Sequence, residues 1–288
     1  MNIRPYRLSQ IDMGDFTLAG YSVAGEESVI VVPELDIVFD IGKCPREALV
    51  PNNVLLTHGH ADHSVGLLYY FHQRHFQSNA GGRAYVPENL VEPLHGLFRA
   101  WGRVEGHPPP YELVGVSPGD EFEIRRNLLV RSFPTKHIRG SLGFSVIDVR
   151  FKLKEEYLGL GGHELVKLKN QGIEITHRNE VPLVAYLGDT APKNYSAIPA
   201  VRDARALLIE CTFFDDEHNS RAWAGKHMHI KDLPQVLEGM GNERIIITHI
   251  TRRTNIGLAR KLLRKTLPAE TLKKITILMS REHAVNDG

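Results

Sequence analysis

The sequence feature that most constrains the fold is a cluster of three histidines and one aspartate directly behind an apolar run. Residues 53–57 have the character of a buried strand, and His58-Gly59-His60-Ala61-Asp62-His63 follows them. Residues 63–77 then carry apolar side chains at helical spacing. Neutral imidazole suits zinc, and an added carboxylate widens the choice toward manganese or iron. A merely solvated loop would explain one histidine, but this spacing between a strand and a helix favours a metal site.

Length and composition indicate an ordinary α/β globule. A chain of 288 residues with 42% apolar and 24% charged residues can form one layered domain, which we expect to cover residues 1–288. No apolar run is long enough to cross a bilayer, so no membrane partner is expected. The first residues lack the pattern of a secretory signal and only two cysteines are present, which favours the cytoplasm. The net charge of +1 argues against a globally basic nucleic-acid binder, although a local basic face remains open.

Hydrophobic periodicity predicts strands separated by helices. The expected strands span residues 16–23, 28–32, 37–40, 53–57, 83–87, 121–124, 128–133, 143–149, 181–187, 206–210, 244–249 and 275–279. The expected helices span residues 63–77, 88–101, 232–240 and 255–267. Residues 150–180 differ from the rest because charges and glycines are frequent there. We expect this segment to be an insertion or a surface arm, solvated in preference to phosphate-binding.

Several strands of the second half end at a residue that can bind a metal or a proton. His137, Asp189, Glu210 and His249 each lie at or close behind the end of an apolar run. Ligands in α/β folds commonly bind beyond the carboxyl ends of strands. If these strands share sheets, their terminal residues converge on one edge.

This arrangement resembles the metallo-β-lactamase superfamily, whose fold is a four-layer αββα sandwich of the α/β class. The resemblance implies two divalent metal ions, with Zn2+ as the first candidate and Mn2+ or Fe2+ as alternatives. It also implies the ligands. His58, His60 and His137 would hold one ion, Asp62, His63 and His249 the other, and Asp189 would bridge them.

Within that superfamily the chain most resembles ribonuclease Z-like phosphodiesterases. The similar segments are Phe133-Pro134-Thr135-Lys136-His137, Gly188-Asp189-Thr190, Ile209-Glu210-Cys211-Thr212-Phe213, Gly225-Lys226-His227 and Thr248-His249-Ile250. The resemblance implies that Glu210 and His227 act together at the leaving group, although nearby His229 could take the role of His227. Asp62 would also accept the proton of the attacking water. The expected activity is phosphodiester hydrolysis, with RNA as a candidate substrate and tRNA 3′ processing as its specific form.

Two departures from that family leave the substrate open. The glycine-rich signature and basic loop expected near the N-terminus are missing from residues 1–32, and residues 150–180 look short for a tRNA-gripping arm. A homodimer is suggested only by the resemblance. The alternatives are a metallohydrolase of a thioester, lactone or other acyl compound, and a nucleic-acid-binding protein with a vestigial site.

Overall fold

The first half of the chain, together with the short strand β14, builds one mixed sheet. The computed structural model describes residues 8–78 and 81–278. Residues 1–7, where the sequence predicts no secretory signal, lie outside the described residues. Strands run in the order β1-β2-β3-β4-β5-β6-β7, with β14 beside β2. Their bounds are β1 (Ser9–Asp12), β2 (Thr17–Ala24), β3 (Glu27–Val32), β4 (Ile37–Phe39), β5 (Asn53–Leu55), β6 (Arg83–Pro87), β7 (Glu112–Val116) and β14 (Ile250–Thr251). The pairing is antiparallel from β1 to β4 and parallel from β4 to β7.

The second half builds the other sheet with the same change of direction. Its order is β15-β13-β12-β11-β10-β9-β8. The bounds are β8 (Glu121–Arg125), β9 (Leu128–Pro134), β10 (Leu142–Leu153), β11 (Thr176–Tyr186), β12 (Ala206–Glu210), β13 (Arg244–Thr248) and β15 (Ile275–Ile277). Pairing is antiparallel from β8 to β11 and parallel from β11 to β15. The expected final strand, residues 275–279, corresponds to β15 and begins at the predicted residue, while Met279 lies outside the described residues.

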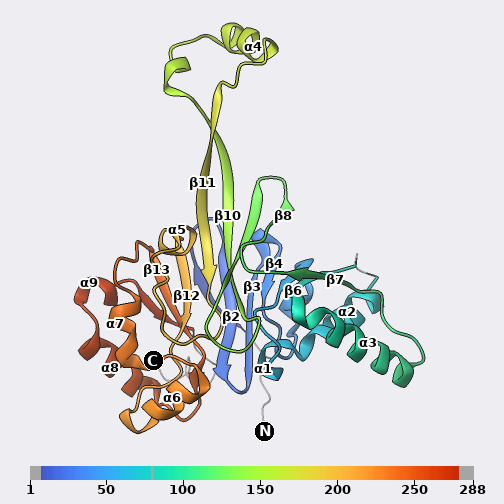
Figure 1. The fold of residues 1–288 in the computed structure, drawn as a ribbon, viewed down its shortest axis with the longest axis vertical. Coiled ribbons are helices and arrows are strands. Elements are labelled where there is room, and N and C mark those ends of the chain that lie inside the picture. The colour runs from blue at the N-terminus through green and yellow to red at the C-terminus, as the bar shows by residue number, and fades with distance from the viewer. Residues whose placement is uncertain (1–7, 79–80, 279–288) are drawn as a thin grey trace.

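Helices cover the outer faces of both sheets (Figure 1). The helices of the described residues are α1 (Ala61–Ser64), α2 (Gly66–Phe76), α3 (Val91–Glu105), α4 (Gly162–Asn170), α5 (Pro199–Arg202), α6 (Asn219–Gly225), α7 (Leu233–Val236), α8 (Ile256–Thr266) and α9 (Ala269–Leu272). None of the helices in the described ranges combines the length and apolar character that a membrane span requires.

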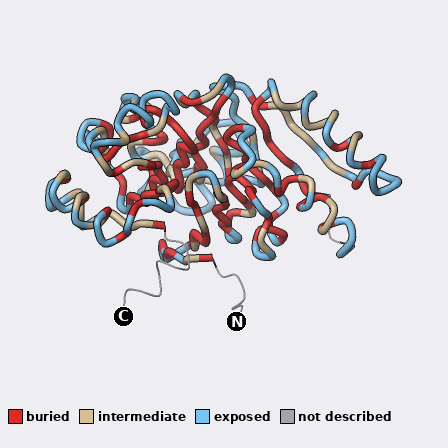
Figure 2. Tube along the Cα trace, turned by 90° about the horizontal axis from the view of Figure 1, so that it is seen from below, coloured by how far each residue is buried: buried red, intermediate tan, exposed pale blue. Residues whose placement is uncertain are grey.

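Three apolar clusters define four layers. One lies between the sheets and includes Phe39 and Tyr186, whose rings meet edge to face with centroids 5.4 Å apart. A second packs α7 and α8 on the second sheet, and a third packs α2 and α3 on the first. Buried residues accordingly fill the middle of the molecule, and exposed residues lie along its outer turns (Figure 2). The αββα sandwich expected from the sequence is confirmed.

Strands β10 and β11 continue past the sheet as a two-stranded ribbon that carries α4 at its tip (Figure 1). Their pairing extends to Leu153 and Thr176, so the charged segment 150–180 is partly strand and not only loop. None of the residues from 150 to 180 is buried. Figure 1 places α4 at the opposite end of the molecule from α1 and α6.

The expected helix over residues 232–240 is wrong in extent. The structure has a 3-10 turn at Ile230–Asp232 and the single-turn helix α7 at Leu233–Val236. Gly239 adopts φ +74°, a left-handed conformation that ends regular helix soon after Val236. The expected helix over residues 63–77 is also divided, because α1 and α2 meet at Val65.

Candidate metal centre

Loops from both sheets bring the seven expected metal-binding residues to one end of the sandwich. His58 and His60 follow β5, and Asp62 and His63 lie on α1. His137 follows β9, Asp189 follows β11 and His249 follows β13. Gly188 permits this approach because it has φ +57° and a Cβ there would lie 2.8 Å from the Thr57 side chain. The strand-end rule applied to the sequence predicted that these side chains converge, and the structure brings them together.

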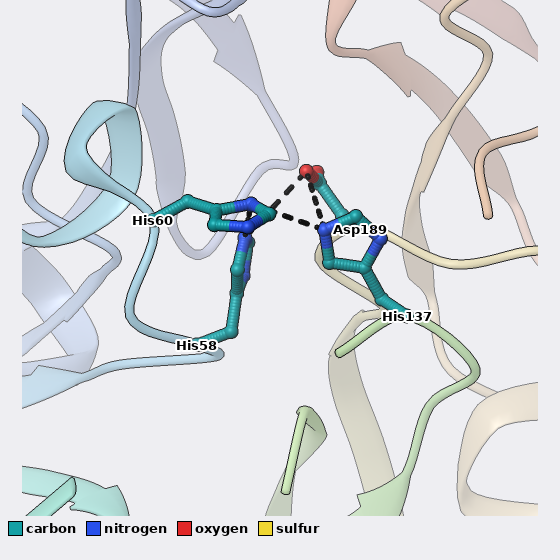
Figure 3. A group of neighbouring side chains, drawn as sticks. All are labelled: His58, His60, His137 and Asp189. Atoms are coloured by element: carbon teal, nitrogen blue, oxygen red, sulfur yellow. Dashed lines mark hydrogen bonds and ion pairs between the residues drawn. The ribbon is translucent and has the colours of Figure 1, made fainter. Parts of the chain in front are cut away.

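His58, His60, His137 and Asp189 form the first group. Their ligand atoms all lie within 4.8 Å of one another, and the side chains turn toward one another in Figure 3. Nδ1 of His60 is 3.1 Å from Nε2 of both His58 and His137. One Nδ1–H could satisfy only one of these two lone pairs, so the three imidazoles converge more closely than hydrogen bonding among them explains.

Asp62, His63 and His249 form the second group, whose ligand atoms also lie within 4.8 Å of one another. Oδ2 of Asp62 accepts from the Gly25 N–H at 2.8 Å and lies 3.4 Å from Nε2 of His249. Burial opposes ionisation, but His249, His63 and this N–H together hold the pKa of Asp62 below its usual range. His249 has φ +58°, an uncommon conformation for a non-glycine residue that is typical of functional sites.

Asp189 lies between the two groups. Its Oδ2 is 3.7 Å from Nε2 of His58, 3.4 Å from that of His63, 3.8 Å from that of His137 and 3.4 Å from that of His249. Although burial favours the neutral acid, the surrounding histidines hold the pKa of Asp189 well below its usual value. An ionised carboxylate thus faces four imidazoles.

Hydrogen bonds at Nδ1, on the side of each ring away from Asp189, determine the tautomers of those four imidazoles. Nδ1–H of His137 donates to the Lys226 carbonyl, and Nδ1–H of His63 donates to a carboxylate. The hydroxyls of Thr57 and Thr212, which give their own protons to carboxylates, accept from Nδ1 of His58 and His249. In its neutral form each ring consequently presents the lone pair of Nε2 toward Asp189.

Such an arrangement requires positive charge, either as protons on the imidazoles or as bound cations. Lone pairs and an anionic oxygen within 4 Å repel one another in a buried site unless positive charge lies among them. Nε2 of His63 and Oδ1 of Asp189 are buried without a hydrogen-bond partner in the described part of the chain. Burial lowers the pKa of His63, but Asp189 and Asp40 outweigh it and raise that pKa well above its usual value. The donor set therefore fits divalent metal ions.

Glu210 and His227 meet beside this cluster. Nδ1 of His227 lies 2.9 Å from Oε1 of Glu210 and 4.0 Å from Oδ2 of Asp189. Burial lowers the pKa of His227, but Glu210 and Asp189 raise it to about 9, which favours the protonated ring at neutral pH. Glu210 is completely buried and also accepts from the backbone N–H groups of Thr190 and Met228.

His229 does not share this position. Its Nε2 donates to the Asp215 carbonyl at 3.0 Å, and its Nδ1 accepts from the backbone N–H of Lys231. Both ring nitrogens therefore bond to backbone. His227, and not His229, is thus the ring that lies beside Asp189.

Sequence reasoning missed the role of Asp40. This fully buried carboxylate follows β4 and accepts from Nδ1 of His63 at 2.7 Å and from the Tyr186 hydroxyl at 2.8 Å. It also accepts from the Thr57 hydroxyl, which links it to His58. Its position at a strand end, like that of Asp189, was the available signal.

Comparisons with known proteins agree with this geometry. The model of a family described as "Beta-lactamase superfamily domain" matches residues 42–250. The chain is 33% identical to tRNase Z TRZ1 of Arabidopsis thaliana over 84% of this chain and 87% of that protein. It is 31% identical to the chloroplastic tRNase Z TRZ2 of the same plant, over 93% of this chain and 76% of that protein. The solved structure of the metallo-beta-lactamase fold protein YhfI from Bacillus subtilis matches with a TM-score of 0.63 and 14% identity, covering 90% of this chain and 93% of that one.

Proposed function

Since the chain belongs to the ribonuclease Z (tRNase Z) family of the beta-lactamase superfamily, we propose that this metal-dependent phosphodiesterase cleaves precursor tRNA at its 3′ end. The observation that carries the proposal is the Glu210–His227 pair, which lies 4.0 Å from the Asp189 carboxylate. A thioester releases a thiolate, which has less need of a proton donor. An RNA alkoxide needs one.

His58, His60 and His137 would hold one divalent ion and Asp62, His63 and His249 a second, with Asp189 shared between them. Zinc is the preferred ion because most of the donors are imidazoles, and manganese or iron is the alternative. When bound, two such ions activate a water and offset the charge that develops on the phosphate.

His227 would protonate the departing oxygen. Glu210 holds Nδ1–H of the ring, so the opposite nitrogen, Nε2, is the one that meets the substrate. Glu210 also stabilises the imidazolium before transfer. General acid assistance of this kind typically contributes about 100- to 10,000-fold in rate. Asp62, which is ionised and only partly exposed, is positioned to accept the proton of the attacking water.

The decisive experiment compares metal-replete cleavage of a precursor tRNA, bis(p-nitrophenyl) phosphate, a thioester and a lactone. We expect cleavage of the RNA and the diester only. His58→Ala should abolish both reactions. His227→Ala should slow RNA cleavage about 100-fold or more and slow the diester less, because p-nitrophenolate leaves without a proton.

Different results would redirect the proposal. Thioester or lactone turnover above that of the RNA and diester would favour acyl hydrolysis. Full RNA cleavage by the His227→Ala protein would remove the proton-donor role while leaving the metal site intact. A wild-type protein that binds no metal and cleaves nothing would favour the vestigial-site alternative.

Three finer expectations accompany this proposal. The family resemblance suggests a homodimer, which sedimentation at several protein concentrations would test. Metal analysis of the protein purified from its own cells would identify the ion. Cytoplasmic residence also stays a prediction, and a fluorescent fusion of the full-length gene product would examine it.

A further inference from the structure

Helix α6 carries an unusually exposed tryptophan, Trp223, four residues before the proposed proton donor His227. The Trp223 side chain is 86% exposed, whereas Ala222 beside it is buried and anchors the helix. An indole on the surface contributes nothing to the apolar core, and large exposed aromatic side chains commonly mark contact sites.

The turn after α6 connects this tryptophan rigidly to His227. The Trp223 carbonyl accepts from the Lys226 N–H at 3.2 Å, and the Ala222 carbonyl accepts from the His227 N–H at 2.9 Å. These two bonds form a Schellman C-cap. Four residues can span at most about 14 Å even when fully extended. Trp223 therefore lies within a few nucleotides of His227 at about 3.4 Å rise per nucleotide.

Lys226 gives the same turn a positive charge. It adopts φ +54°, where glycine is the usual residue, and its carbonyl accepts from Nδ1 of His137 at 3.3 Å. Its side chain and that of Arg221 are exposed, and within residues 8–78 and 81–278 neither forms an ion pair with a carboxylate. An exposed aromatic ring beside free cations is the combination that single-stranded nucleic acids bind.

We propose that Trp223 is a positioning residue on which an unpaired base of the RNA stacks, next to the bond that is cleaved, while Lys226 contacts the adjoining phosphate. This inference rests on the proposed function and specifies how its substrate is held. Stacking tolerates any base, because every base presents a π-face. Trp223 would therefore hold a single strand at the site without reading its sequence.

Kinetics of Trp223→Ala, Trp223→Phe and Phe76→Ala test the proposal. Phe76 is the matched control, since it is 85% exposed at the end of α2 and belongs to neither metal group. For Trp223→Ala we expect the ratio of kcat/KM for precursor tRNA to kcat/KM for bis(p-nitrophenyl) phosphate to fall about 5- to 150-fold. Trp223→Phe should restore most of the ratio, and Phe76→Ala should keep it. An unchanged ratio in Trp223→Ala, or an equal loss with both substrates, would overturn the proposal.

A binding measurement separates this inference from the proposed function. The chain has two tryptophans, so Trp101→Phe leaves Trp223 as the single indole fluorophore. With the metal chelated to prevent cleavage, a short single-stranded RNA should quench that emission, and an abasic strand of equal length should not. Absence of quenching, or equal quenching by the abasic strand, would overturn the stacking role even if the enzyme cleaves tRNA. If the wild-type protein instead fails to cleave tRNA, the proposed function fails, and the fluorescence result still decides whether Trp223 stacks on a base.

Discussion

Asp40 should determine how tightly the site binds metal although it is not itself a proposed ligand. It receives hydrogen bonds from His63, Thr57 and Tyr186 in a fully buried position. In Asp40→Asn, an amide N–H₂ would replace one acceptor and face these donors. Partners behind metal-binding histidines typically change affinity about 10- to 100-fold, and an unsatisfied buried group costs about 1–3 kcal/mol. We expect both losses, measured by chelator competition and by urea unfolding.

Two features make this test specific. Asp40 has φ +51°, a conformation that asparagine also tolerates, so the backbone is not the variable. Tyr186→Phe serves as the control, because it removes one hydrogen bond to Asp40 but leaves the carboxylate and its bonds to His63 and Thr57. That protein should lose about 1 kcal/mol of stability and keep its metal. Wild-type affinity in Asp40→Asn would show that His63 does not depend on this carboxylate for its orientation.

At the scale of single residues, the sequence predicts the candidate metal-binding residues better than it predicts the residues that hydrogen-bond to them. His137, Asp189 and His249 could be chosen because strand ends converge and these residue types bind metals. Thr57 and Thr212 could not be chosen in this way. A threonine hydroxyl links a histidine to a carboxylate only when its rotamer brings the oxygen within hydrogen-bonding distance of both groups. That depends on side-chain packing from two separate loops, which periodicity does not encode.

The ribbon of β10 and β11 should be dispensable for the stability of the sandwich. Phe151 pairs with Arg178, so replacing residues 152–177 with Asn-Gly would close the ribbon with a two-residue hairpin turn. None of the residues from 150 to 180 is buried, so little apolar area is lost. We expect the free energy of unfolding to change by less than about 1 kcal/mol, with diester hydrolysis retained because α4 lies at the opposite end from α1 and α6.

A substitution in the buried part of the same strand provides the contrast. Val146 lies on β10 with no exposed surface, and Val146→Ala should cost about 2 kcal/mol. A large shift in the urea midpoint of the shortened protein, comparable with that of Val146→Ala, would mean that the ribbon supports the core.

Elements were predictable where at least one face is buried. Strands such as β12 and β13 are apolar throughout because both faces are covered, and their predicted bounds agree closely with the structure. The outer parts of β10 and β11 are solvated on both faces, so no hydrophobic alternation reveals them, and the segment was predicted only as a charged arm. The two edge strands of the first sheet, β1 and β7, were missed, and each has one buried residue, out of four and five.

The whole molecule places the candidate site where its two halves meet. The first sheet supplies Asp40, which orients His63 directly and His58 through Thr57. The second supplies Glu210, which orients His227 directly and His249 through Thr212. Each half thus contributes one buried carboxylate that orients two imidazoles. Metal ions bound between them would join loops of the two sheets that otherwise present repelling lone pairs to one another.

Metal removal should therefore destabilise the entire sandwich and not only stop catalysis. A ligand that binds only the native state stabilises it by about 4 kcal/mol at a free concentration of 1,000 times its Kd. For a chain of this size, that corresponds to a fall in Tm of about 7 °C when a chelator strips the metal. Calorimetry of the metal-loaded and metal-free proteins would measure it. His58→Ala is the control, and its Tm should respond less to the chelator because one group of donors is incomplete. An unchanged Tm after verified metal loss would mean that the apo site is already held in place by Asp40, Glu210 and their hydrogen bonds alone.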